Sequence, residues 1–367
     1  MCGYIAILSH SLFNDICTLR GRLLSVSLFF SSLYLLNFAA TFSITTYPSI
    51  VGRVISFLRN WTLPVAMLAG VLIYAAFHNI SFLQPLHAGV WAVDAYLTPL
   101  LIFCQLLLTF CRVNPREFRL RRWHLWLLLF QIIGASVAYL CLAPLSSVLA
   151  QGAMVCLICP TATAAAVITH KLGGSAETLI TFTLLDNIMA AIYVPLVFPL
   201  VYAQSGGLEF FDAFVLILGK VFPLLIFPFL LAQVLRFCLP KAHAWLRDNS
   251  GIAFYIWALA LALVMGKTAK SVVDDSDEMF IVLSLALVAV VACAVQFLFG
   301  KITGGHYGDR ISGGQALGQK NTVLAIWMSQ TYLNPLSCVA PGAYVLWQNI
   351  VNSYQLWKKR HKEAQQN

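Results

Sequence analysis

Long apolar runs constrain this chain more than any other feature of its sequence. Ten such segments follow one another after Asn60. An α-helix that rises about 1.5 Å per residue needs about 20 residues to cross a hydrocarbon layer of roughly 30 Å, and most of the segments approach or exceed that length. The strands of a membrane barrel would instead be about ten residues long with alternating polar and apolar side chains, and that alternation is missing. We therefore predict an all-α integral membrane protein.

The composition agrees with this class, because 60% of the 367 residues are hydrophobic and only 10% are charged. A soluble protein of this size could not bury so large an apolar fraction in its core. We expect one unit of ten transmembrane helices over residues 54–357, followed by a short basic cytoplasmic tail over residues 358–367. The ten segments lie in residues 61–80, 92–111, 122–143, 146–169, 177–203, 213–236, 250–267, 279–300, 312–331 and 335–357.

The basic residues gather in the links on one side of these segments. By the positive-inside rule that side is cytoplasmic, so both ends of the ten-helix unit are predicted to be cytoplasmic in a multi-pass protein of the inner (plasma) membrane. The net charge of +9 then reflects topology rather than binding to nucleic acid, and the expected partner is the lipid bilayer. The basic side carries 17 of the 23 Lys and Arg, namely Arg53, Arg59, Arg112, Arg116, Arg119, Arg121, Arg122, Lys171, Arg236, Lys241, Arg247, Lys301, Arg310, Lys358, Lys359, Arg360 and Lys362. The opposite side carries Lys267 and Lys270 with the acidic Asp274, Asp275, Asp277 and Glu278.

The first part of the chain, residues 1–53, is an N-terminal extension of uncertain status. Its stretch from Leu23 to Ala40 is apolar enough for one more membrane segment, but Arg20 and Arg22 lie on the side that the topology makes external. The alternatives are an uncleaved signal-like anchor and translation from an upstream start. We expect an appendage outside the working fold.

Ten segments divide into two halves of five, which have opposite orientations in the membrane because five is odd. Such an arrangement is an inverted repeat. Pro64 near the start of the first segment and Pro223 in the sixth lie at comparable places, an agreement that either reflects the repeat or arises by chance. We predict two inverted five-helix repeats.

The fourth and ninth segments correspond in this repeat, and both contain residues that interrupt a helix. The fourth has Pro160 followed by small and hydroxyl side chains, and the ninth has Gly313, Gly314 and Gly318. Proline removes an amide donor, and glycine costs about 1 kcal/mol relative to alanine inside a helix. Broken segments at corresponding positions are the best sequence indication of a substrate site, although small residues also let helices pack closely.

A full positive charge, Lys320, follows the glycines of the ninth segment. A lysine at the centre of a bilayer costs roughly 2.5 to 3.5 kcal/mol, so a charge at this place is a hypothesis of function that requires a partner. The stretch from Gly318 to Thr322 is therefore the most informative part of the chain.

Three stretches together resemble the bile acid:sodium symporters. The tenth segment contains Pro341-Gly342-Ala343-Tyr344-Val345-Leu346-Trp347-Gln348-Asn349, which is similar to that family's proline-glycine-alanine motif with a tryptophan and, two residues on, an asparagine. Asn321-Thr322 resembles the crossing of the ninth segment, and Pro160 to Thr169 that of the fourth. The likeness extends over residues 58–357.

The resemblance implies a panel domain of helices 1, 2, 6 and 7 and a core domain of helices 3, 4, 5, 8, 9 and 10. Broken helices 4 and 9 cross in the core, and a small organic anion is carried by alternating access. Asn321 and Asn349 stand where the family contacts its substrate, and each carboxamide either binds a carboxylate or hydroxyl or links two helices. The candidate substrate-binding residues are Asn321, Asn349, Thr322, Gln348, Thr161 and Thr163.

This sequence departs from the family at its sodium sites. The positions that hold an acidic residue, a glutamine, a serine and an asparagine in the family are Ala316, Lys320, Ala165 and Ala166 here. Sodium needs several oxygen ligands, and an ammonium group repels it. We therefore expect neither the usual two sodium sites nor any other metal or cofactor. The one close cysteine pair, Cys156 and Cys159, lacks the second pair or histidine of a zinc site.

A lysine can take the place of the missing cation if a counter-ion lies near it. Asp186 is the acidic residue deep in the predicted core, and the fourth, fifth and ninth segments meet in the family's core. We predict a buried ion pair between Asp186 and Lys320, which either exchanges a proton during transport or only holds two helices together. The candidate ion-coupling residues are Lys320, Asp186, Asn187 and Gln319.

The prediction is thus a transporter and not an enzyme. The alternative is a membrane-embedded sensor or enzyme that retains the transporter fold. An enzyme would need a nucleophile with a base, or a metal cluster, within a span, and the histidines from His78 onward fall at segment ends or in links. A sensor would normally carry a soluble output domain, and only ten residues follow Trp357.

Overall fold

The computed structural model describes residues 62–80, 84–113, 118–202, 209–274 and 278–366. The chain divides into residues 1–62 and 63–367, and apart from Thr62 every element described here belongs to the second unit. The predictions made for residues 1–53, for Arg53, Arg59 and Arg116 and for Asp275 and Asp277 lie outside the described residues.

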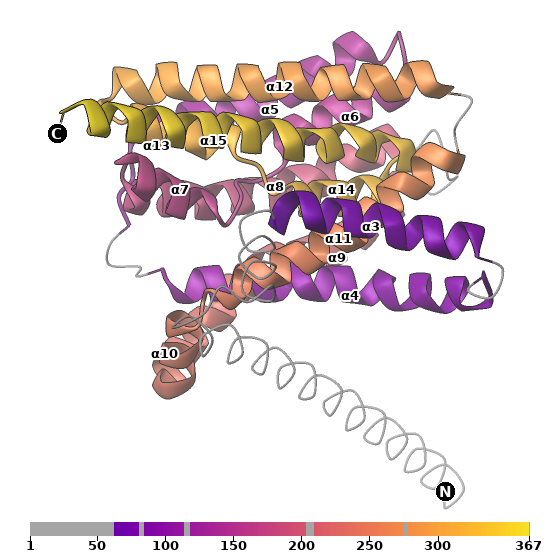
Figure 1. The fold of residues 1–367 in the computed structure, drawn as a ribbon, viewed down its shortest axis with the longest axis horizontal. Helices are drawn as coiled ribbons and strands as arrows, with labels where there is room; N and C mark the ends of the chain where they lie inside the picture. Colours follow the sequence, from indigo (N-terminus) through magenta and orange to yellow (C-terminus); the bar gives the residue numbers. More distant parts are fainter. Residues whose placement is uncertain (1–61, 81–83, 114–117, 203–208, 275–277, 367) are drawn as a thin grey trace, which may run out of the picture. The chain divides into compact units, whose positions relative to one another are not determined.

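All regular elements in the described ranges are helices (Figure 1). Each predicted segment contains one helix or an interrupted pair. The elements are α3 (Thr62–Asn79), α4 (Gln84–Cys111), α5 (Arg122–Leu142), α6 (Ser147–Ile158), α7 (Ala165–Leu172), α8 (Ala176–Tyr202), α9 (Phe210–Cys238), α10 (Pro240–Asp248), α11 (Ile252–Asp274), α12 (Met279–His306), α13 (Arg310–Gly318), α14 (Thr322–Tyr332), the short 3-10 helix η3 (Pro335–Cys338) and α15 (Val339–Gln366).

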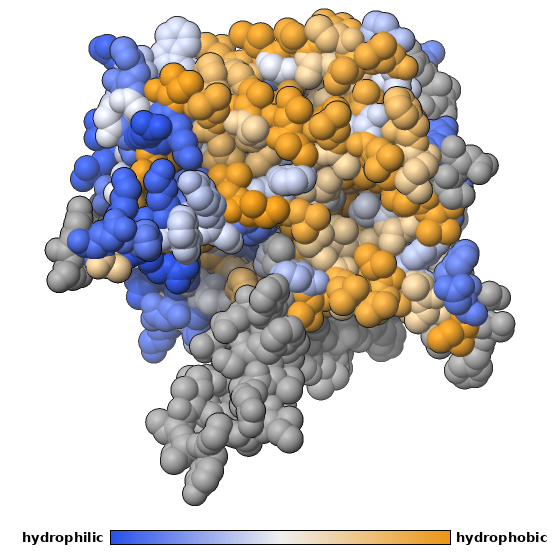
Figure 2. Space-filling model, turned by 45° about the horizontal axis from the view of Figure 1, so that its top comes forward, coloured by the Kyte–Doolittle hydropathy of each residue, from blue (hydrophilic) through white to orange (hydrophobic). Residues whose placement is uncertain are grey.

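Six of these helices are long and apolar enough to cross a membrane, counted over the residues that the structure describes. The helices α6 and most of α3 are apolar but shorter. Large hydrophobic side chains such as Leu287 and Leu298 on α12 are exposed, as expected for helices that face lipid. Figure 2 shows a face dominated by hydrophobic residues, with hydrophilic residues gathered toward its two ends. These observations make the chain an all-α, multi-pass membrane protein.

Close packing between α12 and α13 depends on glycine. A Cβ atom on Gly300 would lie 2.3 Å from the carbonyl oxygen of Gly313, and one on Gly313 would lie 2.5 Å from that of Gly300. No side chain fits at either position, so the two backbones are in direct contact. Gly313 therefore serves helix packing, one of the two roles that the sequence allowed for the glycines of the ninth segment.

The sequence did not predict α10, a nine-residue helix between α9 and α11. This part of the chain is a basic link in the topology, and its charges obscured the helical pattern. The helix begins with Pro240, a residue that is well suited to a first helical position because its missing amide hydrogen has no partner to lose there.

Candidate functional site

The two predicted breaks exist, and they meet. The fourth segment is interrupted between Ile158 and Ala165, and the ninth between Gly318 and Thr322. An antiparallel β-bridge pairs Thr161 with Lys320. In this bridge the Asn321 amide donates to the Pro160 carbonyl at 2.8 Å, and the Ala162 amide donates to the Gln319 carbonyl at 2.8 Å. The unwound backbones thus satisfy each other inside the helical bundle, where water is scarce.

Local sequence explains where each break begins. Cys159, the residue before Pro160, has extended backbone angles of φ −56° and ψ 136°, the conformation that a following proline favours. In the second break the Asn321 side chain restarts the helix, because its Oδ1 accepts a hydrogen bond from the Leu324 amide at 3.3 Å. Asparagine is among the preferred residues for such an N-cap.

Asp186 connects the first break to neighbouring helices through hydrogen bonds. Its side chain is fully buried in α8. One carboxylate oxygen accepts from the Thr161 amide at 2.8 Å and lies 2.7 Å from the Thr161 hydroxyl, and the other accepts from Gln131 Nε2 of α5 at 3.0 Å. The Thr161 hydroxyl also lies 2.6 Å from the Ala316 carbonyl of α13. One carboxylate therefore ties together α5, α8 and the crossing.

Lys320 lies in the second break and is 1% exposed. Its main chain is well held, since its amide donates to Gln348 Oε1 at 2.8 Å and its carbonyl accepts from the Thr322 amide at 2.9 Å. Its Nζ has no hydrogen-bond partner in the part of the chain that the structure describes. A buried ammonium without a partner is costly, so its presence calls for an explanation.

The predicted direct ion pair between Asp186 and Lys320 is not formed. Among the described residues no ion pair joins Asp186 and Lys320, and the carboxylate oxygens contact Thr161 and Gln131. Thr161 contacts both residues, since its amide donates to the carboxylate and its backbone pairs with Lys320 in the bridge. The two residues that the sequence predicted in direct contact are therefore linked through Thr161.

A cavity of about 410 Å³ lies against the crossing. Its walls come from both breaks and from α4, α7, α11 and α15. At one end it reaches residues that are exposed at the surface, Arg112 after α4 and Lys171 in α7. Seven of the ten predicted site residues line it, namely Thr163, Gln319, Lys320, Asn321, Thr322, Gln348 and Asn349.

The other three predicted residues, Thr161, Asp186 and Asn187, do not line the cavity. Thr161 and Asp186 lie behind its wall and hold the first break in place. Asn187 is buried in α8, where its Nδ2 donates to the Thr183 carbonyl of the same helix at 2.7 Å. Its predicted role in ion coupling therefore has no direct contact with the cavity.

A match to a family model covers residues 116–348, which is more than half of the chain and includes both breaks, Asp186 and Lys320. The model describes the SBF-like CPA transporter family. The chain belongs to this family. The family is related to the bile acid:sodium symporters, so the resemblance seen in the sequence is confirmed. No curated protein matches the chain.

This SBF-like transporter also places residues in the cavity that the sequence analysis missed. Arg112 and Lys171 were interpreted only as topology signals, yet both line the cavity. Arg112 Nε donates a hydrogen bond to Ser250 Oγ, which places its guanidinium at the mouth. Asn352 and Ser353 follow Gln348 and Asn349 by four residues each, so helical spacing was the signal that would have found them.

A second missed residue pair lies away from the cavity. Asp94 of α4 is 3% exposed and forms an ion pair with Lys267 of α11. The Asp94 carboxylate also accepts from Thr98 Oγ1 at 2.6 Å. The apolar run of the sequence ends at Lys267, but α11 continues to Asp274 and carries Lys267 within it, where it meets Asp94.

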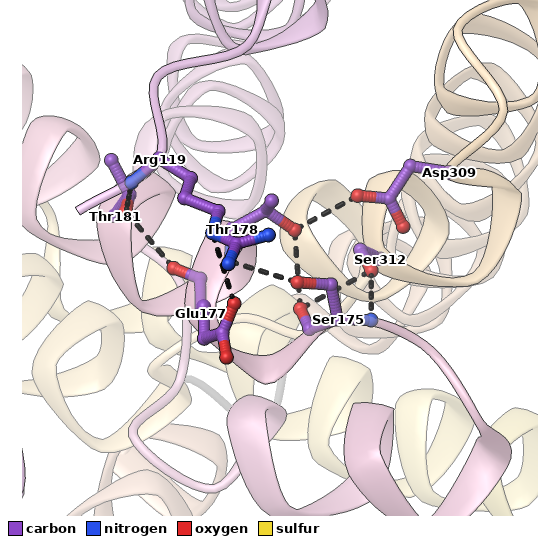
Figure 3. A network of polar contacts seen from close by, with 7 residues as sticks. All are labelled: Arg119, Ser175, Glu177, Thr178, Thr181, Asp309 and Ser312. Atoms are coloured by element: carbon purple, nitrogen blue, oxygen red, sulfur yellow. Dashed lines mark hydrogen bonds and ion pairs between the residues drawn. The ribbon is translucent and has the colours of Figure 1, made fainter. Parts of the chain in front are cut away.

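The outer ends of the broken helices are held by the polar network of Figure 3. Ser312 of α13 accepts from the Ser175 amide at 2.9 Å, and Thr178 Oγ1 donates to Asp309 at 2.8 Å. Arg119 pairs with Glu177 at 3.2 Å. The network fixes the start of α13 to the turn between α7 and α8, so both half-helices that lead to the crossing are anchored at one end.

Proposed function

We propose that this SBF-like transporter is a secondary active carrier of a small organic anion that works by alternating access. The observation that carries the proposal is the charge of the cavity. Lys320, Arg112 and Lys171 line it, and no Asp or Glu is found among the described residues of its wall. Like charges in a recess of low dielectric constant focus a potential that attracts ligands of the opposite sign.

The inner end of the cavity supplies hydrogen-bond donors for such an anion. Lys320 and Asn321 line it, and the Nζ and Nδ2 of these residues are buried and have no partner in the described chain. The identity of Asn321 Nδ2 as a donor follows from its other atom, because Oδ1 is already occupied as the cap of α14. A carboxylate or phosphate that reached these two nitrogens would remove the cost of leaving them unpaired.

The order of the helices supports an inverted repeat. The first half runs from α3 to α8 with its break between α6 and α7, and the second runs from α9 to α15 with its break between α13 and α14. In this scheme the panel domain is α3, α4, α9 and α11, and the remaining spans form the core. The positive-inside rule puts Arg112 and Lys171 on the cytoplasmic side, so the cavity opens inward.

The surroundings of Ala165 and Ala316 support a carrier without the two sodium sites of the related symporters. Both alanines are fully buried in an apolar cluster with Trp123, Leu127 and Phe182. These side chains offer no oxygen ligands for a hard cation. The ammonium of Lys320 supplies a fixed positive charge instead.

The hydrogen bonds of Thr161 support a proton as the coupling ion. Its hydroxyl has one hydrogen but lies within 2.7 Å of two acceptors, Asp186 and the Ala316 carbonyl. Both contacts are satisfied if Asp186 is protonated, because the acid then donates to Thr161 while Thr161 donates to Ala316. The other titratable groups that act on Asp186 are Lys320 and Cys159. Loss of the proton would restore a negative charge near Lys320 and weaken the attraction for an anion.

Transport into proteoliposomes tests this proposal. Anions that raise the melting temperature of the protein in detergent are offered to the vesicles with and without a sodium gradient and with and without a pH gradient. We expect uptake that follows the pH gradient and ignores sodium. Strict dependence on sodium would refute the account of Ala165 and Ala316, and a rate indifferent to both gradients would refute coupling through Asp186.

A mutant and a control separate binding from coupling in the same assay. Lys320→Met removes the buried charge and is expected to abolish uptake, whereas Asp186→Asn keeps an uncharged side chain of the same shape and is expected to keep uptake while losing its dependence on pH. Membership in a transporter family favours this function over the sensor and enzyme alternatives.

A further inference from the structure

Six carboxamide side chains line the cavity, a number that a simple anion would not require. A carboxamide presents both a donor and an acceptor, whereas a carboxylate or phosphate group mainly accepts. Hydroxyl groups, which donate and accept, are the natural partners of such a wall. The six are Gln105, Gln319, Asn321, Gln348, Asn349 and Asn352.

Two carboxamide oxygens of this set, Gln105 Oε1 and Gln319 Oε1, are buried and have no partner among the described residues. Gln105 uses its Nε2 to donate to Thr163 at 2.9 Å. An ionised acidic group cannot satisfy such an oxygen, because it has no hydrogen to donate. A ligand ammonium is disfavoured by Lys320, Arg112 and Lys171, so a ligand that satisfied these oxygens would carry neutral hydroxyls.

The helix α15 arranges its polar residues as one strip along the cavity. Gln348, Asn349, Asn352 and Ser353 follow a spacing of one and four residues, which places them on one face of the helix. Another wall is aromatic, with Phe254 and Trp257 from α11. A sugar ring matches this combination, since its C–H groups form an apolar face for an aromatic ring and its hydroxyls lie at the edge.

The volume agrees with a small ligand. A cavity of about 410 Å³ lies toward the lower end of the roughly 300 to 1,000 Å³ that small-molecule sites occupy. A hexose with one acidic group fits such a cavity, and the chemistry of the wall selects the class.

We infer that the substrate is an anionic monosaccharide, a hexose-sized polyol with one carboxylate or phosphate. This inference rests on the proposed anion transport and narrows it to one class. The acidic group lies near Lys320 and Asn321, and the hydroxyls face the carboxamides of α4 and α15.

Isothermal titration of the purified protein in detergent tests the class with four probes. Glucuronate and glucose 6-phosphate are the two sugar anions, cyclohexanecarboxylate is an anion with a six-membered ring and no hydroxyl, and glucose is neutral. We expect at least one sugar anion to bind at least tenfold more tightly than both cyclohexanecarboxylate and glucose. The tighter of the two sugar anions identifies the acidic group.

The variant Asn349→Ala tests the wall itself. Among the described residues Asn349 Nδ2 donates to the Val345 carbonyl of its own helix at 2.7 Å, so its removal breaks no hydrogen bond between described helices. We expect the affinity for the sugar anion to fall about tenfold and the affinity for cyclohexanecarboxylate to fall less than twofold. Asn79→Ala is the matched control, because Asn79 makes the same bond to Ala75 at 2.8 Å on α3, away from the cavity.

The outcomes separate the class from the function. Equal binding of cyclohexanecarboxylate and the sugar anions would overturn the sugar class and leave anion transport intact. If glucose binds as tightly as the sugar anions, the ligand needs no charge and the inference is wrong. If none of the anions binds, both the sugar class and the proposed anion transport are wrong. If Asn349→Ala lowers the affinity for the sugar anion and for cyclohexanecarboxylate by the same factor, Asn349 does not recognise hydroxyls.

Discussion

Replacement of Asp186 by alanine is expected to loosen the crossing of the broken helices. The change removes the acceptor of the Thr161 amide, while the Thr161 hydroxyl keeps the Ala316 carbonyl at 2.6 Å and Gln131 Nε2 keeps the Leu157 and Cys159 carbonyls at 3.5 Å. One buried donor left without a partner costs about 1 to 3 kcal/mol. At a few degrees or less for each kcal/mol in a protein of this size, the melting temperature falls by about 3 to 9 °C.

The variant Asp186→Asn separates the hydrogen bonds from the charge. Its oxygen accepts from Thr161, and its amide donates to Gln131, whose Oε1 is unpartnered among the described residues and reaches it by rotation of the Gln131 carboxamide. The rotation gives up only the long contacts of Gln131 Nε2 with the Leu157 and Cys159 carbonyls at 3.5 Å, so we expect a melting temperature within about 3 °C of the unmodified protein.

Intrinsic fluorescence during heating in detergent gives the melting temperatures of the unmodified protein, Asp186→Ala and Asp186→Asn. Asp248→Ala is the control, because the side chain of Asp248 is 64% exposed and its pair with Arg247 contributes little. If Asp186→Ala melts within about 2 °C of the control, the carboxylate does not hold the crossing together and the reasoning is wrong. Equal destabilisation by alanine and asparagine would show instead that the negative charge matters more than the hydrogen bonds.

Three further changes probe other parts of the structure. Lys320→Met is expected to weaken anion binding at least tenfold in isothermal titration and to leave the melting temperature equal or higher, because the Nζ has no partner among the described residues to lose and its buried charge is costly; unchanged binding contradicts this. Thr268→Cys on α11 is expected to form a disulfide with the native Cys338 under mild oxidation, since the native Oγ1 and Sγ atoms are 3.5 Å apart, and to stop transport until reductant is added. Continued transport by the oxidised protein would show that these helices need not separate, and Thr268→Cys with Cys338→Ser is the control. Gly313→Ala is expected to lower the melting temperature through an overpacking cost of about 1 to 3 kcal/mol, whereas Gly219→Ala, with nothing within 4 Å of the added carbon, leaves it equal or higher.

The broken helices were predictable because their causes are local. Proline before Thr161 and glycine before Lys320 act through backbone chemistry that requires no knowledge of the fold. The apolar runs predicted the spans for the same reason, since length and hydropathy belong to each segment alone. The helix α10 was missed because its nine residues carry a charged pattern that also suits a link.

The ion pair was not predictable in its details, because its geometry depends on one intervening residue. The sequence places Asp186 and Lys320 in helices that meet, but only the structure puts Thr161 between them with its amide on the carboxylate. The roles of Arg112 and Lys171 were hidden for a related reason. A basic residue near a segment end is explained by topology alone, so nothing in the sequence requires it to line a cavity as well.

The crossing holds the backbone of Lys320 firmly and leaves its side chain without a partner. The bridge to Thr161, the bond to Gln348 and the turn to Thr322 fix the main chain, whereas the ammonium contacts no acceptor among the described residues. A donor that is fixed in place before the ligand arrives loses little entropy on binding, and a donor that is unpaired beforehand loses no bond. The same arrangement makes the empty site costly, since a buried charge must then be borne without compensation. In the proposed function, an anion that enters would relieve this cost in the crossing itself, where both broken helices meet. The proposed site would then couple the presence of an anion directly to the stability of the element that would have to move during transport.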